Sequence, residues 1–178
     1  MMEQVVLVNA LDEEQGFMEK MEAHEKGLLH RAFSIFIFNE KGELLLQQRA
    51  LDKYHSGGLW TNTCCSHPRP NELVADAAAR RLQEEMGFET PLTKIFDFTY
   101  QASFSNGLTE HEFDHVFIGY YNAAIVPNPI EVNDYAFQTM EMVQASMNQK
   151  DGRFTVWFEI VFPKMMEWWQ ANHSTNLA

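Results

Sequence analysis

The sequence has few cysteines, few basic residues and no long apolar run. Its two cysteines, Cys64 and Cys65, are neighbours and cannot join distant segments, so we expect no disulfide framework and a cytoplasmic protein. Only 13 Lys and Arg accompany 25 Asp and Glu, a net charge of −12, so we expect no nucleic-acid partner. No stretch approaches the roughly 18 apolar residues that span a bilayer, and no basic leader precedes Val5, so we expect no membrane partner.

The chain is rich in core-forming residues. Hydrophobic residues make up 46% of its 178 residues, which is enough apolar surface to order a core. No repeat or low-complexity linker divides the sequence, and no glycine-rich nucleotide fingerprint occurs in it. We therefore expect one domain over residues 1–178, as a monomer or a homodimer.

Periodicity predicts an α/β fold, with a mixed α+β sheet and flanking helices. Strands are predicted at residues 5–7, 32–38, 43–48, 95–104, 110–121 and 135–139. A turn at residues 39–42 is expected to join the second and third strands in a hairpin, and a long loop is predicted over residues 52–70. Helices are predicted at residues 72–86, 140–148 and 156–171, the last in spite of Pro163.

The helix predicted over residues 72–86 is the most clearly marked element. Asn71 is a candidate N-cap, and Gly87 stands where a left-handed residue ends a helix. On a helical wheel one sector is charged (Arg80, Arg81, Glu84 and Glu85) and the opposite one apolar (Ala75, Ala79, Leu82 and Met86). Taken alone, the charged sector is typical of a solvated face with the ion pairs Arg80–Glu84 and Arg81–Glu85.

The longer string around this helix resembles the Nudix box. Glu72 is followed after seven residues by Arg80 and the sequence RLQEEMGF. In that family a loop and helix present carboxylates to a divalent metal bound to a diphosphate. Two positions depart from the pattern, because Ser66 replaces the leading glycine and Arg81 replaces a glutamate. The resemblance implies that hydrolytic members use this glutamate to hold metal and activate water.

The loop before the helix reads TNTCCSHP, residues 61–68. Buried packing is the common fate of an intracellular cysteine, and His67 can serve simply as a turn residue. A thiol beside an imidazole can also act as an acid or base when a metal or charge lies nearby. Both interpretations stay open on the spacing alone.

Two glutamates, Glu110 and Glu112, share one face of a predicted strand because side chains alternate along a strand. Such a pair is usually exposed to solvent. Pooled with His24, His30 and His67, the two carboxylates would make a three-nitrogen, two-oxygen set suited to zinc, manganese or magnesium. Each histidine alone is more often structural than a ligand.

Four segments together resemble the type I isopentenyl-diphosphate delta-isomerase family. They are TNTCCSHP (61–68), EHEFDH (110–115), the divergent box (72–88) and HRAFSIFIFN (30–39), and the match runs from Lys20 to Trp157. The resemblance implies a compact Nudix-like domain. It also implies the interconversion of isopentenyl and dimethylallyl diphosphate in isoprenoid biosynthesis, through a tertiary carbocation, so the expected partner is a small prenyl diphosphate.

The resemblance also assigns roles to individual residues. It implies a metal site of His24, His30, His67, Glu110 and Glu112 for one divalent ion (Mn²⁺, Zn²⁺ or Mg²⁺). It implies that Glu85 helps to bind a Mg²⁺ that arrives with the diphosphate. Cys65 and Glu112 correspond to the acid/base pair, with Tyr100 beside them, and Cys64 is expected to pack. The expected substrate contacts are Lys20, Arg49, Lys53 and Arg81 at the diphosphate and Trp157 at the hydrocarbon end.

Two alternatives to an isomerase remain open. Glu84, Glu85 and the box are also consistent with a Nudix-type hydrolase of a nucleotide or prenyl diphosphate. A binding module that keeps the fold without turnover is the third hypothesis. The simultaneous presence of Cys65, His67, Glu110 and Glu112 argues against the binding module, because a site without catalytic activity does not need all four residues.

Overall fold

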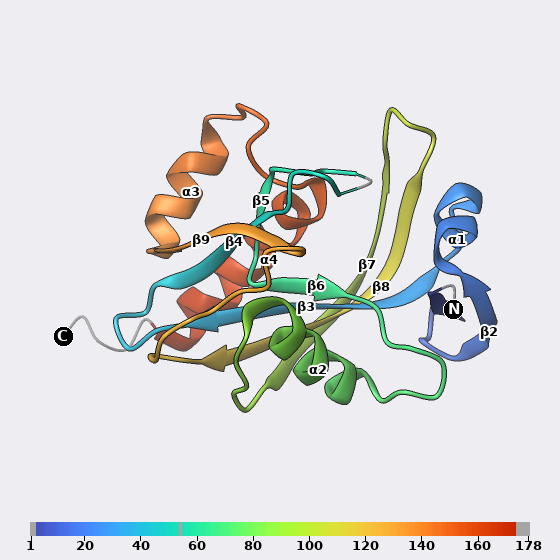
Figure 1. Cartoon of the computed structure of the whole chain (residues 1–178), viewed down its shortest axis with the longest axis horizontal. Helices are drawn as coiled ribbons and strands as arrows, with labels where there is room; N and C mark the ends of the chain where they lie inside the picture. Colours follow the sequence, from blue (N-terminus) through green and yellow to red (C-terminus); the bar gives the residue numbers. More distant parts are fainter. Residues whose placement is uncertain (1–2, 54, 174–178) are drawn as a thin grey trace.

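The computed structural model describes residues 3–53 and 55–173. Figure 1 shows a twisted sheet with helices on its two faces. The strands are β1 (Gln4–Val8), β2 (Glu14–Glu19), β3 (His30–Phe38), β4 (Leu44–Arg49), β5 (Trp60–Thr61), β6 (Cys64–Ser66), β7 (Thr93–Ser103), β8 (Thr109–Tyr120) and β9 (Val132–Gln138). The helices are α1 (Lys20–Lys26), α2 (Val74–Met86), α3 (Met140–Asn148) and α4 (Val156–His173).

Strand β3 lies at the centre of the sheet. It runs parallel to β8 along its whole length, while β1, β6 and β4 pair with it in antiparallel register. Strand β8 pairs further with β7, and β4 pairs with β5 and β9. Such a central strand must be apolar on both sides, which explains the nearly continuous apolar run HRAFSIFIF.

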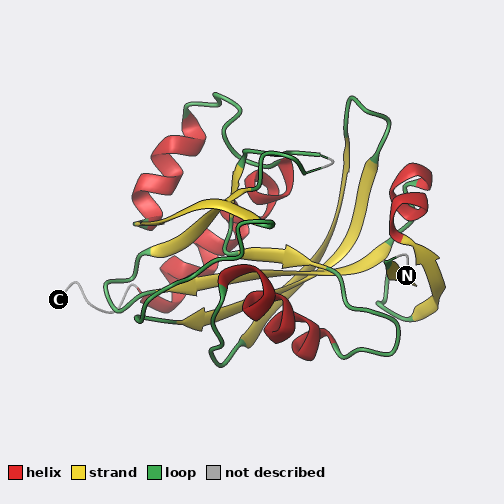
Figure 2. Ribbon diagram, in the orientation of Figure 1, coloured by secondary structure: helices red, strands yellow, loops and turns green. Residues whose placement is uncertain are grey.

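The two faces of β3 contribute to two separate cores. Phe33, Ile35 and Ile37 pack with the buried face of α2, and Phe36 and Phe38 pack with side chains of α3 and α4. Figure 2 shows α2 on one side of the strands and α4 on the other. The predicted α/β class with a mixed sheet and flanking helices is therefore confirmed.

Several predicted elements differ in detail from the observed ones. The β3–β4 hairpin is limited to the pair Phe38–Leu44, because β4 turns away toward β9 and leaves the edge of β3 to β6. Strands β5 and β6 thus lie inside the segment predicted as a loop. The sequence analysis also missed β2 and α1, which are short and carry mixed polar patterns.

The predicted start and buried face of α2 were wrong. The helix begins at Val74 with Leu73 as N-cap, and Asn71 instead takes a left-handed φ of 63° in the preceding turn. Ala75 and Ala79 are exposed, whereas the buried face consists of Ala77, Ala78, Leu82, Glu85 and Met86. The observed buried face is rotated about the helix axis relative to the predicted one, and it includes Glu85, which therefore points into the protein. Both predicted ion pairs of this helix are confirmed.

Among the described residues, no helix is long and apolar enough to span a bilayer.

We predict that Gly87 is indispensable to the end of α2. It has a φ of 78°, and a Cβ atom there would lie 2.1 Å from the carbonyl oxygen of Val126. Gly107 has a similar φ of 86° with nothing within 4 Å, so it isolates the conformational cost. Gly107→Ala should lower the free energy of unfolding by about 1 kcal/mol and Gly87→Ala by at least about 2–3 kcal/mol. Urea titration measures both, and equal losses would contradict the clash.

Candidate metal centre and active site

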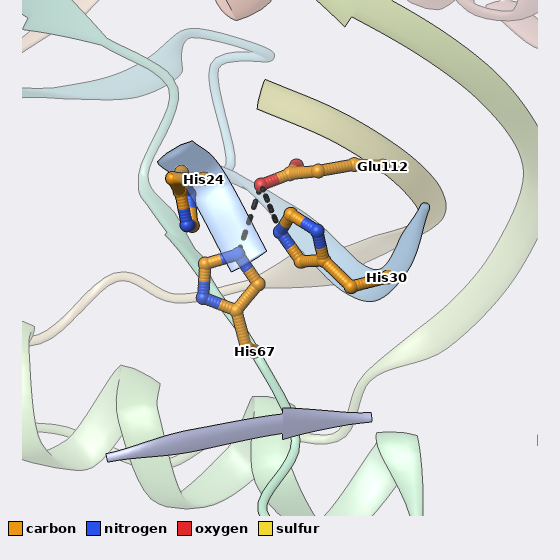
Figure 3. A group of neighbouring side chains, drawn as sticks. All are labelled: His24, His30, His67 and Glu112. Carbon is orange, nitrogen blue, oxygen red and sulfur yellow. Dashed lines mark hydrogen bonds and ion pairs between the residues drawn. The ribbon is translucent and has the colours of Figure 1, made fainter. Parts of the chain in front are cut away.

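Three histidines and one glutamate converge at one end of β3. His24 comes from α1, His30 begins β3, His67 follows β6, and Glu112 lies on β8. One ligand atom from each of the four lies within 4.8 Å of the others. Figure 3 shows the four side chains gathered around one point. Helix α1 ends at Gly27, whose left-handed conformation turns the chain back into β3 and so brings His24 to His30. Four of the predicted metal residues are thus brought together.

Two of the imidazoles are held with one ring nitrogen free. The Nδ1 atom of His24 lies 2.7 Å from the carbonyl oxygen of Lys20, and that of His30 lies 2.8 Å from the carbonyl oxygen of Leu28. A carbonyl only accepts, so both Nδ1 atoms carry the proton and both Nε2 lone pairs are available. These Nε2 atoms are buried without a hydrogen-bond partner. The donor set therefore fits a divalent ion.

The protonation states of the group also suit a cation. Burial lowers the pKa of His67 to about 4, so that ring is neutral near pH 7, and burial likewise lowers the pKa of His24. Although burial opposes it, the neighbouring imidazoles of His30 and His67 keep the pKa of Glu112 well below its usual range. The Oε1 atom of Glu112 lies 2.8 Å from His67 Nε2 and 3.6 Å from His30 Nε2. Neutral imidazoles around a buried carboxylate are a typical zinc or manganese environment.

Glu110 lies next to this group but not within it. Both glutamates are buried rather than solvent-exposed, and the hydroxyl of Tyr100 lies 3.0 Å from Glu110 Oε2 and 2.7 Å from Glu112 Oε2. Burial, and then the charge of Glu112, raises the pKa of Glu110 well above its usual range. The phenol of Tyr100 therefore bridges two carboxyl groups, and the nearby charge of Glu112 favours the protonated form of Glu110.

The thiol of Cys65 faces the same site from β6. Its Sγ lies 2.9 Å from Asn62 Oδ1 and 3.6 Å from Ser34 Oγ, and burial followed by the charge of Asp114 raises its pKa. Cys64 points to the opposite side, where it is fully buried in the core beneath α2. The alternation of side chains along β6 thus separates the two thiols.

A cavity of about 70 Å³ joins these groups to the basic residues. Besides Cys65, Tyr100, Glu110 and Glu112, its lining includes the predicted substrate contacts Lys20, Arg49, Lys53, Arg81 and Trp157. It adjoins a groove of about 1090 Å³ that is also lined by Lys20, Lys53 and Arg81. Every predicted site residue therefore lies in this cavity or in the adjacent histidine group.

Three of the four cations of the cavity lie beside carboxylates, whereas Arg49 donates to the backbone carbonyl of His55. Arg81 lies 2.5 Å from Glu85 Oε1 and 2.7 Å from Glu84 Oε2, Lys53 pairs with Glu131, and Lys20 lies 3.2 Å from a carboxylate oxygen of Glu3. The Nε atom of Arg81 is buried and unpaired. Glu85 faces the cavity from α2, apart from the histidine group, and also accepts a hydrogen bond from Gln47.

Trp157 and Arg49 are stacked. The guanidinium of Arg49 lies 5.1 Å from the centre of the Trp157 ring, which is within cation–π distance. The indole Nε1 of Trp157 is buried without a partner.

Some residues of the site were not predicted. His55 lines the cavity, with Nε2 3.6 Å from Glu110 Oε1 and its ring stacked on Phe104, and burial lowers its pKa to about 3. Nothing in its loop sequence distinguishes it from a surface histidine. Asp114 was also not predicted. It lies two residues after Glu112, so the alternation of side chains along a strand already placed it on the same face of β8 as Glu110 and Glu112. It accepts a hydrogen bond from the Ser34 hydroxyl at 2.7 Å.

The sequence was compared with known families and curated proteins. The model of the NUDIX domain family matches residues 28–158. The isopentenyl-diphosphate Delta-isomerase of Pectobacterium atrosepticum is 49% identical over 94% of this chain and 94% of its own. Isopentenyl-diphosphate Delta-isomerase 2 of Aromatoleum aromaticum is 50% identical over 88% of this chain and 83% of its own.

Solved structures confirm the fold. The DR0079 protein of Deinococcus radiodurans superposes with a TM-score of 0.76 at 17% identity, over 91% of this chain and 98% of its own. The MutT protein of Methanosarcina mazei gives a TM-score of 0.65 at 20% identity, over 78% and 94%. With half of its residues identical to curated isomerases over most of its length, the chain belongs to the isopentenyl-diphosphate Delta-isomerase family of the Nudix superfamily.

Proposed function

We propose that the protein interconverts isopentenyl and dimethylallyl diphosphate with Cys65 and Glu112 as its acid/base pair. One observation carries the proposal, namely that a thiol and a carboxylate from different strands line one buried cavity that also holds four cationic side chains. The names and the high identity of the curated relatives support the same reaction.

The chemistry requires two proton-transfer groups. A proton is added to C4 of the alkene, which leaves a tertiary carbocation at C3, and another proton leaves C2 to form the new double bond. A group on each side of the five-carbon chain is needed for the two transfers. Cys65 on β6 and Glu112 on β8 belong to strands that pair with opposite edges of β3, and both side chains line the cavity, which supports this assignment. The phenol of Tyr100, hydrogen-bonded to Glu112, would orient that carboxyl group.

The diphosphate end is bound by Lys20, Arg49, Lys53 and Arg81. Arginine forms paired hydrogen bonds with phosphate oxygens, and lysine adds compact charge. Carboxylate partners hold Lys20, Lys53 and Arg81 in place before substrate arrives, and the carbonyl of His55 accepts a hydrogen bond from Arg49. This local cluster explains how a chain of net charge −12 binds an anion.

Divalent metal would be held by His24, His30, His67 and Glu112, with Glu110 as a further ligand. Zinc, manganese and magnesium are the candidates, and a second Mg²⁺ would accompany the diphosphate at Glu85. When bound, the ion at the histidines supplies positive charge that makes the adjoining carboxyl group a stronger acid. The neutral imidazoles and their backbone hydrogen bonds position the ligands.

Trp157 closes the hydrocarbon end of the cavity. Its ring face suits a carbocation, and such an interaction contributes about 2 kcal/mol when water is excluded. The contact with Arg49 shows that this face accepts a cation. Arg49 is itself a diphosphate ligand in this proposal, so substrate binding would draw its guanidinium away from the ring.

The hydrolase alternative is not favoured. Arg81 replaces the glutamate expected to hold metal and activate water, and it binds Glu84 and Glu85 through ion pairs of 2.7 and 2.5 Å. What the box lacks is the glutamate at position 81 that the resemblance assigns to water activation, whereas Glu84 and Glu85 remain and pair with Arg81.

Turnover of isopentenyl diphosphate in deuterated water tests the reaction. With metal-loaded protein and Mg²⁺, we expect dimethylallyl diphosphate carrying deuterium in a methyl group, detected by NMR or mass spectrometry. Release of phosphate or of a monophosphate without isomer would instead support hydrolysis. No product and no exchange from folded, metal-loaded protein would support a binding module.

The two adjacent cysteines provide a matched test of the acid/base assignment. We predict that Cys65→Ala lowers kcat by at least about 100-fold, the typical contribution of a positioned acid or base. Cys64→Ala should keep turnover near the parent value, because Cys64 faces the core, and should instead lower the free energy of unfolding. Steady-state kinetics and urea titration measure the two effects. Equal losses of turnover in both variants would refute the choice of Cys65.

Metal affinity can be tested with two partly buried histidines, His67 after β6 and His111 on β8. His67→Ala removes a ligand and should weaken Mn²⁺ or Zn²⁺ binding by at least about 10-fold, as losses even in the outer shell do. His111 lies between the two glutamates but faces the other side of β8, where its Nδ1 contacts the carbonyl of Gly27. His111→Ala should leave affinity unchanged. Isothermal titration calorimetry of the metal-free protein decides, and an unchanged affinity in His67→Ala would disprove the site.

A further inference from the structure

The side chain of Asn62 has its orientation fixed by the backbone. Asn62 is fully buried between β5 and β6, and its Nδ2 donates to the carbonyl oxygens of Ile35 and Cys64, both at 3.1 Å. Because both amide protons are used on carbonyls, the Oδ1 atom must point the other way. It points at the thiol of Cys65, 2.9 Å from Sγ.

Two threonine hydroxyls form a chain of hydrogen bonds that also ends at the amide oxygen of Asn62. Thr155 donates to Thr61 at 3.0 Å, and Thr61 donates to Asn62 Oδ1 at 3.0 Å. The amide oxygen has no proton, so the thiol is the donor in the contact with Asn62. The S–H bond of Cys65 therefore points into the protein, and the sulfur lone pairs are left to face the cavity.

The other neighbour of the thiol also acts as an acceptor. Ser34 lies opposite Cys65 in the β3–β6 pair, with Oγ 3.6 Å from Sγ. Its own proton is donated to Asp114 Oδ2 at 2.7 Å, so its oxygen can only accept from sulfur. Asn62 and Ser34 thus bracket the thiol with two acceptors, of which the amide oxygen is much the closer.

We propose that Asn62 is a positioning residue that fixes both the place of the Cys65 sulfur and the direction of its S–H bond. The catalytic part of this inference rests on the proposed function. Asn62 does not line the cavity and acts through Cys65 alone. Its loss would leave the diphosphate contacts and the histidine group in place while the sulfur changes rotamer.

Such a residue affects turnover more than substrate binding. Removing the amide should lower kcat by about 10- to 100-fold, the cost of misplacing a reacting group by about 1 Å. KM for isopentenyl diphosphate should stay within about twofold, because the groups that bind the diphosphate are untouched. A merely structural defect would disturb both constants.

Infrared spectroscopy of the S–H stretch tests the hydrogen bond without any reference to activity. In a Cys64→Ala background, Cys65 is the only cysteine and supplies the whole S–H band. Asn62→Leu removes the acceptor and should move the band to higher frequency. Thr61→Val removes the competing donor to Asn62 Oδ1, so the thiol bond strengthens and the band should move to lower frequency.

Thr63 supplies the matched control. It is as buried as Thr61, but its hydroxyl donates to the carbonyl of Leu45 and accepts from the amide of Ile37. Thr63→Val should therefore leave the band in place. Opposite shifts in the Asn62 and Thr61 variants support the proposal, and if Asn62→Leu fails to fold the Thr61 shift decides. A band that does not move, or moves upward in Thr61→Val, overturns it.

The two proposals fail in different ways. An inactive parent protein whose S–H band shifts as expected would reject the isomerase reaction and retain the role of Asn62 in holding the thiol. An active parent protein whose S–H band does not shift in the Asn62→Leu and Thr61→Val variants would reject only the positioning role of Asn62.

Discussion

The register of β3 against its neighbours is the constraint on which the whole site depends. His30 pairs with Glu112 across the parallel β3–β8 ladder, and Ser34 pairs with Cys65 across the antiparallel β3–β6 ladder. Tyr100 in turn pairs with Glu112 across β7–β8. A shift of one residue in any of these ladders would send a functional side chain to the opposite face. The apolar residues of β3, buried on both faces, oppose such a shift and so hold the chemistry in place.

Buried charges cost free energy unless they are paired with opposite charges. The protein meets this demand by pairing the cavity cations with its own carboxylates, as Arg81 with Glu85 and Lys53 with Glu131. A diphosphate would therefore replace existing partners rather than bind bare charges. The affinity for a diphosphate would then depend on the difference in free energy between the cations paired with carboxylates and the same cations paired with phosphate. Such an exchange of partners favours reversible binding.

The sequence predicted the elements that have a clear period and the residues that stand in specific motifs. Apart from β5 and β6, the strands and helices from residue 32 onward were found with small errors at their ends, and the four metal residues His24, His30, His67 and Glu112 converge. Short polar elements such as α1 carry no period, so their position could not be predicted. His55 joins the site only through tertiary packing against Phe104 and Trp157, which no local pattern records.

The same α2 helix that carries metal ligands in hydrolytic Nudix proteins has a different use here. Arg81 places a guanidinium where the resemblance implies a glutamate, and it lies 2.5 Å from Glu85 Oε1. The buried carboxylates Glu110 and Glu112 lie on β8 instead, beside the histidines. The cavity is therefore lined by acidic residues from a helix and from a strand, so the basic residues and the histidines each have carboxylates of their own.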